Sequence, residues 1–253
     1  TASITDSTVN GNIATRNGGG LFNEIVAIVN LTNSRFSANS AADGGGIYNE
    51  DGQVVISGGS LIANDSSGDG GGLLATSSAV TTVDGTSVSG NRAGGHGGAF
   101  SNDGILSISN LTIASNTADG NGAAVANSST LILDTVLLST NVAVGSGGAI
   151  YNDSVGSLTL SGTSISNNTA GVNGGGIANT ASGRLTLGSS TLDGNTAGVR
   201  GGGLSHSSAV TATITESTIA NNSAATGGGI GAVGRLLVTN STISANQATG
   251  NGG

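Results

Sequence analysis

The chain has 253 residues, of which 47 are glycine, and it contains no proline, cysteine, methionine or tryptophan. The absence of cysteine excludes disulfide bonds and thiolate metal sites. A net charge of −8, with six arginines and no lysine, disfavours nucleic acids and anionic membrane surfaces as partners, because both are bound by basic patches.

A tract of the type Gly-Gly-Gly-Ile-Tyr-Asn recurs along the whole chain at intervals of 25 to 27 residues. Self-similarity at a fixed period of about 20 to 50 residues is typical of solenoids, in which each repeat buries its apolar side chains against its neighbours. The tracts begin at Gly18, Gly44, Gly70, Gly97, Gly122, Gly147, Gly174, Gly201, Gly227 and Gly252.

Each period contains three short segments that alternate apolar residues with small or polar ones. In the repeat that begins at Gly174 these segments are 177–179, 184–187 and 190–195. Alternation with a period of two predicts half-buried strands, and no window has the period of a helix. The sequence therefore predicts an all-β fold, a single parallel β-helix with about ten coils of roughly 26 residues and three short strands per coil.

Two apolar columns are expected to form the core of this solenoid, since like side chains stack when strands pair in register. The first column lies three residues after each tract start: Leu21, Ile47, Leu73, Phe100, Val125, Ile150, Ile177, Leu204 and Ile230. The second column is Val9, Phe36, Ile62, Val88, Ile113, Leu138, Ile165, Leu192, Ile219 and Ile243.

Two asparagine columns run beside the apolar ones, and stacked amides can bond to one another and to the backbone of tight corners. We therefore expect a structural role for them. The first column is Asn12, Asn39, Asn91, Asn116, Asn141, Asn168, Asn195, Asn222 and Asn246, with Asp65 expected in the third coil. The second is Asn23, Asn49, Asn102, Asn127, Asn152 and Asn179, followed by His206 and Ala232.

At these residues the chain resembles a known family. Its motifs Gly147-Gly148-Ala149-Ile150 and Phe36-Ser37-Ala38-Asn39 are similar to the GGA[ILV] and FxxN motifs of the polymorphic outer-membrane proteins of chlamydiae. Similar repeats occur in right-handed parallel β-helix repeat proteins of bacterial surfaces. The resemblance implies a right-handed coil, which parallel crossovers also favour. It further implies an extracellular or surface-displayed role in adhesion or in building a surface layer.

Residues 1–253 are expected to form one continuous repeat domain with no evident cap at either end. An open coil presents unpaired backbone groups, so the sequence predicts that further coils add there, with copies of the chain stacking head to tail as one interpretation. No apolar run predicts direct insertion into a membrane.

Four residues are candidates for an exposed contact patch beside the glycine tracts, namely Phe22, Tyr48, Leu74 and Tyr151. Exposed aromatic rings stack on sugar rings or pack against a neighbouring rod. The sequence therefore leaves two partners open, a second copy of the chain and a glycan.

Calcium binding, polysaccharide cleavage and ice binding would each depend on a different set of residues. Glu24, Glu50 and Asp51 are weak candidates for a calcium site, and the polysaccharide lyases that share this fold use such clustered carboxylates. Threonines and serines also form a column, of the kind that ice-binding solenoids expose. That column is Thr8, Ser87, Thr112, Ser164, Thr191, Thr218 and Thr242, interrupted by Arg35, Leu61 and Leu137.

We predict from these patterns an extracellular structural rod, without enzymatic activity or a required cofactor, that forms or belongs to a cell-surface filament. The alternative is the passenger segment of a surface adhesin that binds glycans or host or neighbouring cells. A polysaccharide lyase and an ice-binding protein are the less favoured interpretations, since no nucleophile or paired acid stands out in the sequence.

Overall fold

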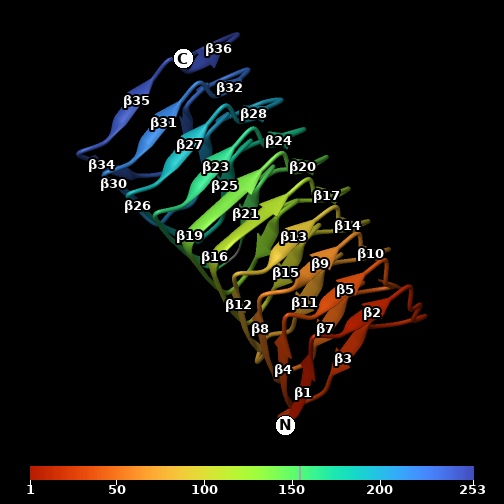
Figure 1. Cartoon of the computed structure of the whole chain (residues 1–253). Helices are drawn as coiled ribbons and strands as arrows, with labels where there is room; N and C mark the ends of the chain where they lie inside the picture. Colours follow the sequence, from red (N-terminus) through yellow and green to blue (C-terminus); the bar gives the residue numbers. More distant parts are fainter. Residues whose placement is uncertain (154) are drawn as a thin grey trace.

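A computed structural model shows the fold of residues 1–153 and 155–253. These residues form strands and turns without any helix, and every strand pairs in parallel with the equivalent strand one turn away. The chain rises in one direction from its N-terminus to its C-terminus (Figure 1). This arrangement confirms the predicted parallel β-solenoid. Among the described residues no helix is long and apolar enough to cross a membrane.

The strands form three sheets that run the length of the rod. Sheet III has nine strands, one after each of the first nine glycine tracts. The predicted segments are therefore strands, and each turn has a further two-residue strand in sheet II. Sheet III contains β3 (Leu21–Asn23), β7 (Ile47–Asn49), β11 (Leu73–Ala75), β15 (Phe100–Asn102), β18 (Val125–Asn127), β21 (Ile150–Asn152), β25 (Ile177–Asn179), β29 (Leu204–His206) and β33 (Ile230–Ala232). Sheet II contains β6 (Ser40–Ala41), β10 (Asp65–Ser66), β14 (Arg92–Ala93), β17 (Thr117–Ala118), β20 (Val142–Ala143), β24 (Thr169–Ala170), β28 (Thr196–Ala197), β32 (Ser223–Ala224) and β36 (Gln247–Ala248).

Sheet I has 18 strands in two adjacent columns. Its first column is β1 (Ala2–Thr5), β4 (Ile28–Thr32), β8 (Gln53–Ser57), β12 (Val80–Asp84), β22 (Ser157–Ser161), β26 (Arg184–Gly188), β30 (Ala212–Thr215) and β34 (Leu236–Thr239). Its second is β2 (Thr8–Asn10), β5 (Arg35–Ser37), β9 (Ser60–Ile62), β13 (Ser87–Ser89), β23 (Ser164–Ser166), β27 (Thr191–Asp193), β31 (Thr218–Ala220) and β35 (Thr242–Ser244). The ten-residue strands β16 (Ile105–Ala114) and β19 (Thr130–Ser139) span both columns.

The bend between the two columns of sheet I explains the two long strands. In most turns a serine or threonine lies at the bend, and its hydroxyl bonds to backbone groups; Ser190, for example, donates to the Gly188 carbonyl and accepts from the Thr163 N–H. In β16 and β19 the same position holds buried Leu111 and Val136. An apolar residue cannot make these bonds, and there the chain continues as one strand.

The first glycine of each tract makes a corner that requires a left-handed backbone. At Gly174 φ is +64°, and a Cβ atom would overlap the carbonyl oxygen of Ile177. Glycine has no Cβ and adopts this conformation without strain. The recurrence of glycine at this position is therefore a requirement of the corner.

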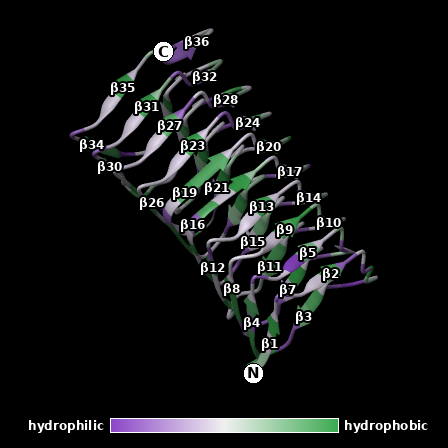
Figure 2. Cartoon of the chain, in the orientation of Figure 1, coloured by the Kyte–Doolittle hydropathy of each residue, from purple (hydrophilic) through white to green (hydrophobic). Residues whose placement is uncertain are grey.

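One continuous cluster of apolar side chains fills the inside of the coil, and buried polar side chains lie at its corners. Figure 2 shows the apolar residues concentrated on the strands, with hydrophilic residues in several of the connecting turns. The first predicted column is buried in every turn except the first and last, where Leu21 and Ile230 are partly exposed. The second column is buried except at its two ends, where Val9 is partly exposed and Ile243 is exposed. It needs one correction, because in the third turn Leu61 is buried and pairs with Phe36, whereas Ile62 is half-buried and pairs with Ser37.

The second column shifts by one residue in the third turn because the loop before it is shorter. Sheet III keeps a spacing of 26 residues between its first strands, since Asn23 pairs with Asn49. The next pair of strands, β4 and β8, is separated by only 25 residues, since Ile28 pairs with Gln53. The loop between them is one residue shorter in the third turn, so a constant period misplaces the next strands by one position.

Candidate functional site

The first asparagine column forms a continuous ladder of buried hydrogen bonds. Asn141 is typical: its Oδ1 accepts bonds from both the backbone N–H and the Nδ2 of Asn116, each at 3.0 Å. Its Nδ2 donates to the Ile113 carbonyl and to Oδ1 of Asn168 at 3.0 Å. The eight ladder asparagines between the two terminal ones are fully buried. The predicted structural role fits this geometry, since every polar atom of the amide is bonded inside the ladder.

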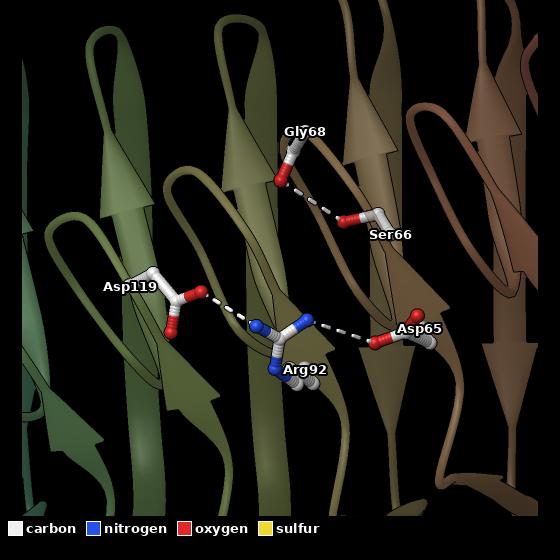
Figure 3. Close-up of polar contacts among 5 residues, drawn as sticks. All are labelled: Asp65, Ser66, Gly68, Arg92 and Asp119. Atoms are coloured by element: carbon white, nitrogen blue, oxygen red, sulfur yellow. Dashed lines mark hydrogen bonds and ion pairs between the residues drawn. The ribbon is translucent and has the colours of Figure 1, made fainter.

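The prediction for the third turn is wrong, because Asn64 rather than Asp65 continues this ladder. Asn64 Oδ1 accepts from Asn39, and its Nδ2 donates to Asn91. Asp65 belongs to β10 and faces outward, where it forms an ion pair with Arg92 at 3.5 Å, and Arg92 also pairs with Asp119 (Figure 3). Both pairs are about half exposed, so they stabilise the fold little.

The second asparagine column also forms a ladder, with an interruption at Ala75. Asn152 Nδ2 donates to Asn179 Oδ1 at 2.6 Å, and Asn127 donates to Asn152 at 2.7 Å. Where Ala75 provides no amide, Asn49 Nδ2 bonds instead to the buried hydroxyl of Thr81 at 3.1 Å. The ladder is therefore repaired from an adjacent strand.

His206 ends this second ladder. Its Nδ1 lies 3.0 Å from Asn179 Nδ2, so Nδ1 accepts the bond and the ring proton is on Nε2. The side chain is fully buried, and Nε2 has no hydrogen-bond partner among the described residues. Burial lowers the pKa of His206, because it disfavours the charged imidazolium, and neighbouring backbone groups of Arg235 and Val210 only partly oppose this shift.

A third ladder, the acceptor ladder, comes directly before the glycine tracts and was missed by the sequence analysis. Each of its side chains accepts a bond from the backbone N–H of the next member, at distances of 2.6 to 3.3 Å. The residue types differ, and only the lone pair is shared, so a search for like residues could not find it. Its accepting residues are Asp43, Asp69, His96, Asn121 and Ser146.

The predicted contact patch lies in one outward column of sheet III. Phe22 and Tyr48 are register partners whose rings stack with centroids 5.4 Å apart at 13°. Phe22 is 40% exposed and Tyr48 and Tyr151 are half-buried, whereas Leu74 is only 8% exposed. Burial, followed by the nearby carboxylates with Glu50 first, raises the pKa of Tyr48.

A shallow groove of about 150 Å³ lies in the same column between Leu74 and Tyr151. Its floor is Ser101 and Ala126, whose small side chains leave a notch between the two larger ones. The acceptor ladder forms one wall, and the column that follows the second asparagine ladder forms the other. The lining residues are Asp69, His96, Ser101, Asp103, Asn121, Ala126, Asn127, Ser128, Tyr151 and Asp153.

The acids of the second wall alternate with hydroxyl residues. Asp103 Oδ1 accepts from the Ser128 hydroxyl, and Asp153 Oδ1 accepts from the Thr180 hydroxyl at 2.9 Å. Asp51 Oδ1 is bonded in the same way to Thr76 at 2.6 Å. These bonds hold each carboxylate in place with one oxygen.

The calcium candidates are not brought together. Asp51 is bonded to Thr76 and to the backbone N–H of Ser78, at 2.6 and 3.1 Å. Within residues 1–153 and 155–253 there is no group of three or more histidine, cysteine or acidic side chains that could hold a metal ion. Glu24 and Glu50 therefore lie along an acidic edge without forming a cluster with Asp51.

The hydroxyl column on sheet I is more regular than the sequence predicted. Ser60, rather than Leu61, pairs with Arg35 and Ser87. Only Arg35 and Leu137 then interrupt the column, from Thr8 to Thr242. The shift of one residue that places Leu61 in the core also places Ser60 in the hydroxyl column.

Residues 96–253 match the sequence pattern of the family described as "Right handed beta helix region". The chain belongs to the right-handed β-helix family. Neither the curated proteins nor the solved structures include a match to the chain. Family membership confirms the predicted hand of this right-handed β-helix. The matched residues include the lining of the groove from His96 onward.

The two histidines of this right-handed β-helix have different surroundings. His96 and His206 are the two histidines; His96 Nδ1 accepts from the Asn121 N–H at 2.9 Å, and His206 is buried at the end of an amide ladder. Neither makes a hydrogen bond to a serine hydroxyl and a carboxylate together among the described residues. The groove, by contrast, combines an aromatic ring, amides and carboxylates on a rigid sheet.

Proposed function

We propose that the protein is an extracellular structural rod, without catalytic activity, that forms or belongs to a cell-surface filament. The observation that carries this proposal is the unbroken asparagine ladder, which links every turn from Asn12 to Asn246. Each turn is bonded to the next by backbone and side-chain groups together, so bending the rod requires many buried bonds to break at once. A stiff spacer is the function that this construction suits.

Assembly through the coil ends supports the filament. In the last turn, the core-column residues Val238 and Ile243 are 38% and 48% exposed, whereas their partners Ile214 and Ile219 in the preceding turn are fully buried. Open strand edges and bare apolar columns recruit further strands. We propose that another copy of the chain stacks on this surface in the same register.

The extracellular location is proposed on the resemblance to surface β-helix repeat proteins and to the polymorphic outer-membrane proteins. A fold without cysteine is stabilised by its apolar core and its ladders, so its stability does not depend on the redox conditions around it. The acidic surface, with a net charge of −8, keeps such rods apart laterally.

Electron microscopy of the purified protein tests the filament. We expect long fibres with an axial repeat of about 4.8 Å by fibre diffraction. Ile243→Asp places a charge on the exposed apolar column and should leave short isolated rods, whereas Ser244→Asp, on the neighbouring exposed residue, should still form fibres. Isolated rods from the unmodified chain at all concentrations would refute stacking.

A second candidate function is favoured by a specific observation, the groove beside the aromatic column of sheet III. Under this proposal the rod is the passenger segment of a surface adhesin that binds glycans. A lyase would instead release unsaturated sugars from an acidic polysaccharide, and we expect no such turnover by this chain.

A further inference from the structure

We propose that the groove between Leu74 and Tyr151 binds a short neutral oligosaccharide. This proposal deepens the second candidate function and does not depend on whether the rods form filaments. It rests on the shape of the groove, on the hydrogen-bonding groups in its walls and on its charge.

The shape of the groove is set by the strand register. Leu74, Ser101, Ala126 and Tyr151 occupy one outward position in four successive turns. Three strand spacings of about 4.8 Å place Leu74 and Tyr151 roughly 14 Å apart, with small side chains between them. A short chain of sugar rings can lie along this floor, with the half-buried ring of Tyr151 as a stacking platform at one end.

The walls offer donors and acceptors on opposite sides. On one side, His96 Nδ1 accepts the Asn121 N–H, which leaves Nε2–H as a donor, and Asn121 Oδ1 is bonded to Ser146, which leaves its amide nitrogen as a donor. On the other side, Asp103 and Asp153 use Oδ1 for hydroxyl partners, and no hydrogen bond among the described residues uses Oδ2 of either. Sugar hydroxyls both donate and accept, so they match this pairing.

These groups are held before any ligand arrives. His96 and Asn121 are fixed by the acceptor ladder, and Asp103 and Asp153 by the hydroxyls of the following turns. Because the strands beneath them pair on both edges, the floor is also fixed. A preorganised site loses less conformational entropy on binding.

The charge of the groove selects against acidic sugars. Its lining includes Asp69, Asp103 and Asp153, and none of its lining residues is arginine or lysine. A chain of uronates would meet like charge, with no cation site nearby among the described residues to bridge it. Neutral sugars do not meet this repulsion.

The groove is a local site within the column. Toward the C-terminus the same outward column continues with Ala178, Ser205 and Gly231. A Cβ atom at Gly231 would overlap the side chain of Arg200, so that side chain already covers the end of the column. Ala178 is fully buried and Ser205 is 5% exposed, and neither of them lines the groove, whose lining residues lie between Asp69 and Asp153.

Isothermal titration calorimetry with neutral tetrasaccharides of glucose and of N-acetylglucosamine tests the proposal, with a tetragalacturonate as the charged comparison. We expect at least one neutral probe to bind and the galacturonate not to bind. Tyr151→Ala should weaken binding by about tenfold or more, and Ala126→Leu should block the floor with a similar loss. Phe22→Ala, in the same column but outside the groove, should bind as the parent does.

Thermal unfolding of each variant separates a lost site from a lost fold. Binding of no neutral probe, stronger binding of the galacturonate, or unchanged affinity in both folded Tyr151→Ala and folded Ala126→Leu would each overturn the proposal. Fibre formation by microscopy is measured on the same samples, so failure of the glycan site and failure of the filament are distinguished.

Discussion

At the scale of single residues, the stability of this rod depends on polar groups that are buried and fully bonded. Amide side chains at the corners bond to backbone groups that a tight turn leaves without partners. Asn141 illustrates this with bonds to the side chain of Asn116, to the side chain of Asn168 and to the Ile113 carbonyl. A buried polar group without a partner costs about 1 to 3 kcal/mol, so a missing ladder member affects several groups at once.

Replacing Asn141 with alanine should therefore destabilise the protein by at least about 2 kcal/mol, because Asn116 loses the acceptor of two buried bonds. Urea unfolding measures the change. Thr169→Ser, an exposed substitution in the adjacent turn, is the matched control and should change stability by less than about 0.5 kcal/mol. Equal stability of the two variants would show that the ladder contributes little.

His206 predicts a pH dependence. Its pKa is lowered in the folded state, so the unfolded chain binds the proton more tightly, and stability is fully present above the ordinary value of 6.5 and falls as the pH drops below it. In His206→Asn the decrease in Tm from about pH 7.5 to about pH 5.5 should be smaller than in the parent. An identical decrease in both proteins would mean that His206 is not the source.

Tyr48 offers a spectroscopic check of the acidic edge. In a Tyr151→Phe background only one phenol remains, and it should titrate above 10.0, because burial and the carboxylates around it raise its pKa. Adding Glu50→Gln removes the largest of the charge contributions and should lower the midpoint, measured by ultraviolet absorbance. A midpoint that does not move would place Glu50 too far from the ring to matter.

At the scale of the structural element, glycines and loop lengths determine where the corners lie, and the alternation of apolar and polar residues determines where the strands lie. Gly174→Ala should be strongly destabilising, since the position needs a positive φ and a Cβ atom would overlap Ile177. Gly188→Ala, within β26, should be tolerated because the nearest atoms to a Cβ atom there lie at 3.7 Å and 3.8 Å. Thermal unfolding compares the two; similar melting would contradict the corner requirement.

The inward and outward faces of each strand should differ in their tolerance of a charged side chain. Ile165→Asp places an unpaired charge in the core and should cost several kcal/mol, whereas Ser164→Asp, on the outward face of the same strand β23, should cost much less. Equal melting temperatures for the two variants would show that the core column is assigned to the wrong face.

Much of this architecture could be predicted from the sequence because the repeat makes it visible. Apolar positions such as Ile150 and Ile177 recur at a fixed distance from the glycine tract, and that tract has a single conformational requirement. The third turn could not be placed by period alone, since a loop shorter by one residue moved Leu61 and Asn64 into the columns. The groove could not be predicted either, because its walls join unlike residues whose only common property is a hydrogen-bonding atom.

At the scale of the whole molecule, the rod is one-dimensional, since each strand pairs only with strands one turn before and one turn after it. Stability in such a chain is approximately a sum over turns and their interfaces. In an isolated rod central turns have two neighbours and terminal turns one, so amide hydrogen exchange there should be slowest in β16 to β21 and fastest in β1, β2, β35 and β36. Uniform protection along the chain would indicate that it unfolds as a single unit.

The acceptor ladder places few demands on residue identity. The corner requires only a side-chain lone pair that can accept a hydrogen bond from the backbone N–H of the next turn. Four different residue types provide it, at Asp69, His96, Asn121 and Ser146. What each of these side chains presents to the surroundings is therefore decoupled from what it does for the fold. A single skeleton of this kind can carry acidic or neutral polar edges turn by turn. The surface can therefore acquire a new binding preference without any change in the backbone beneath it.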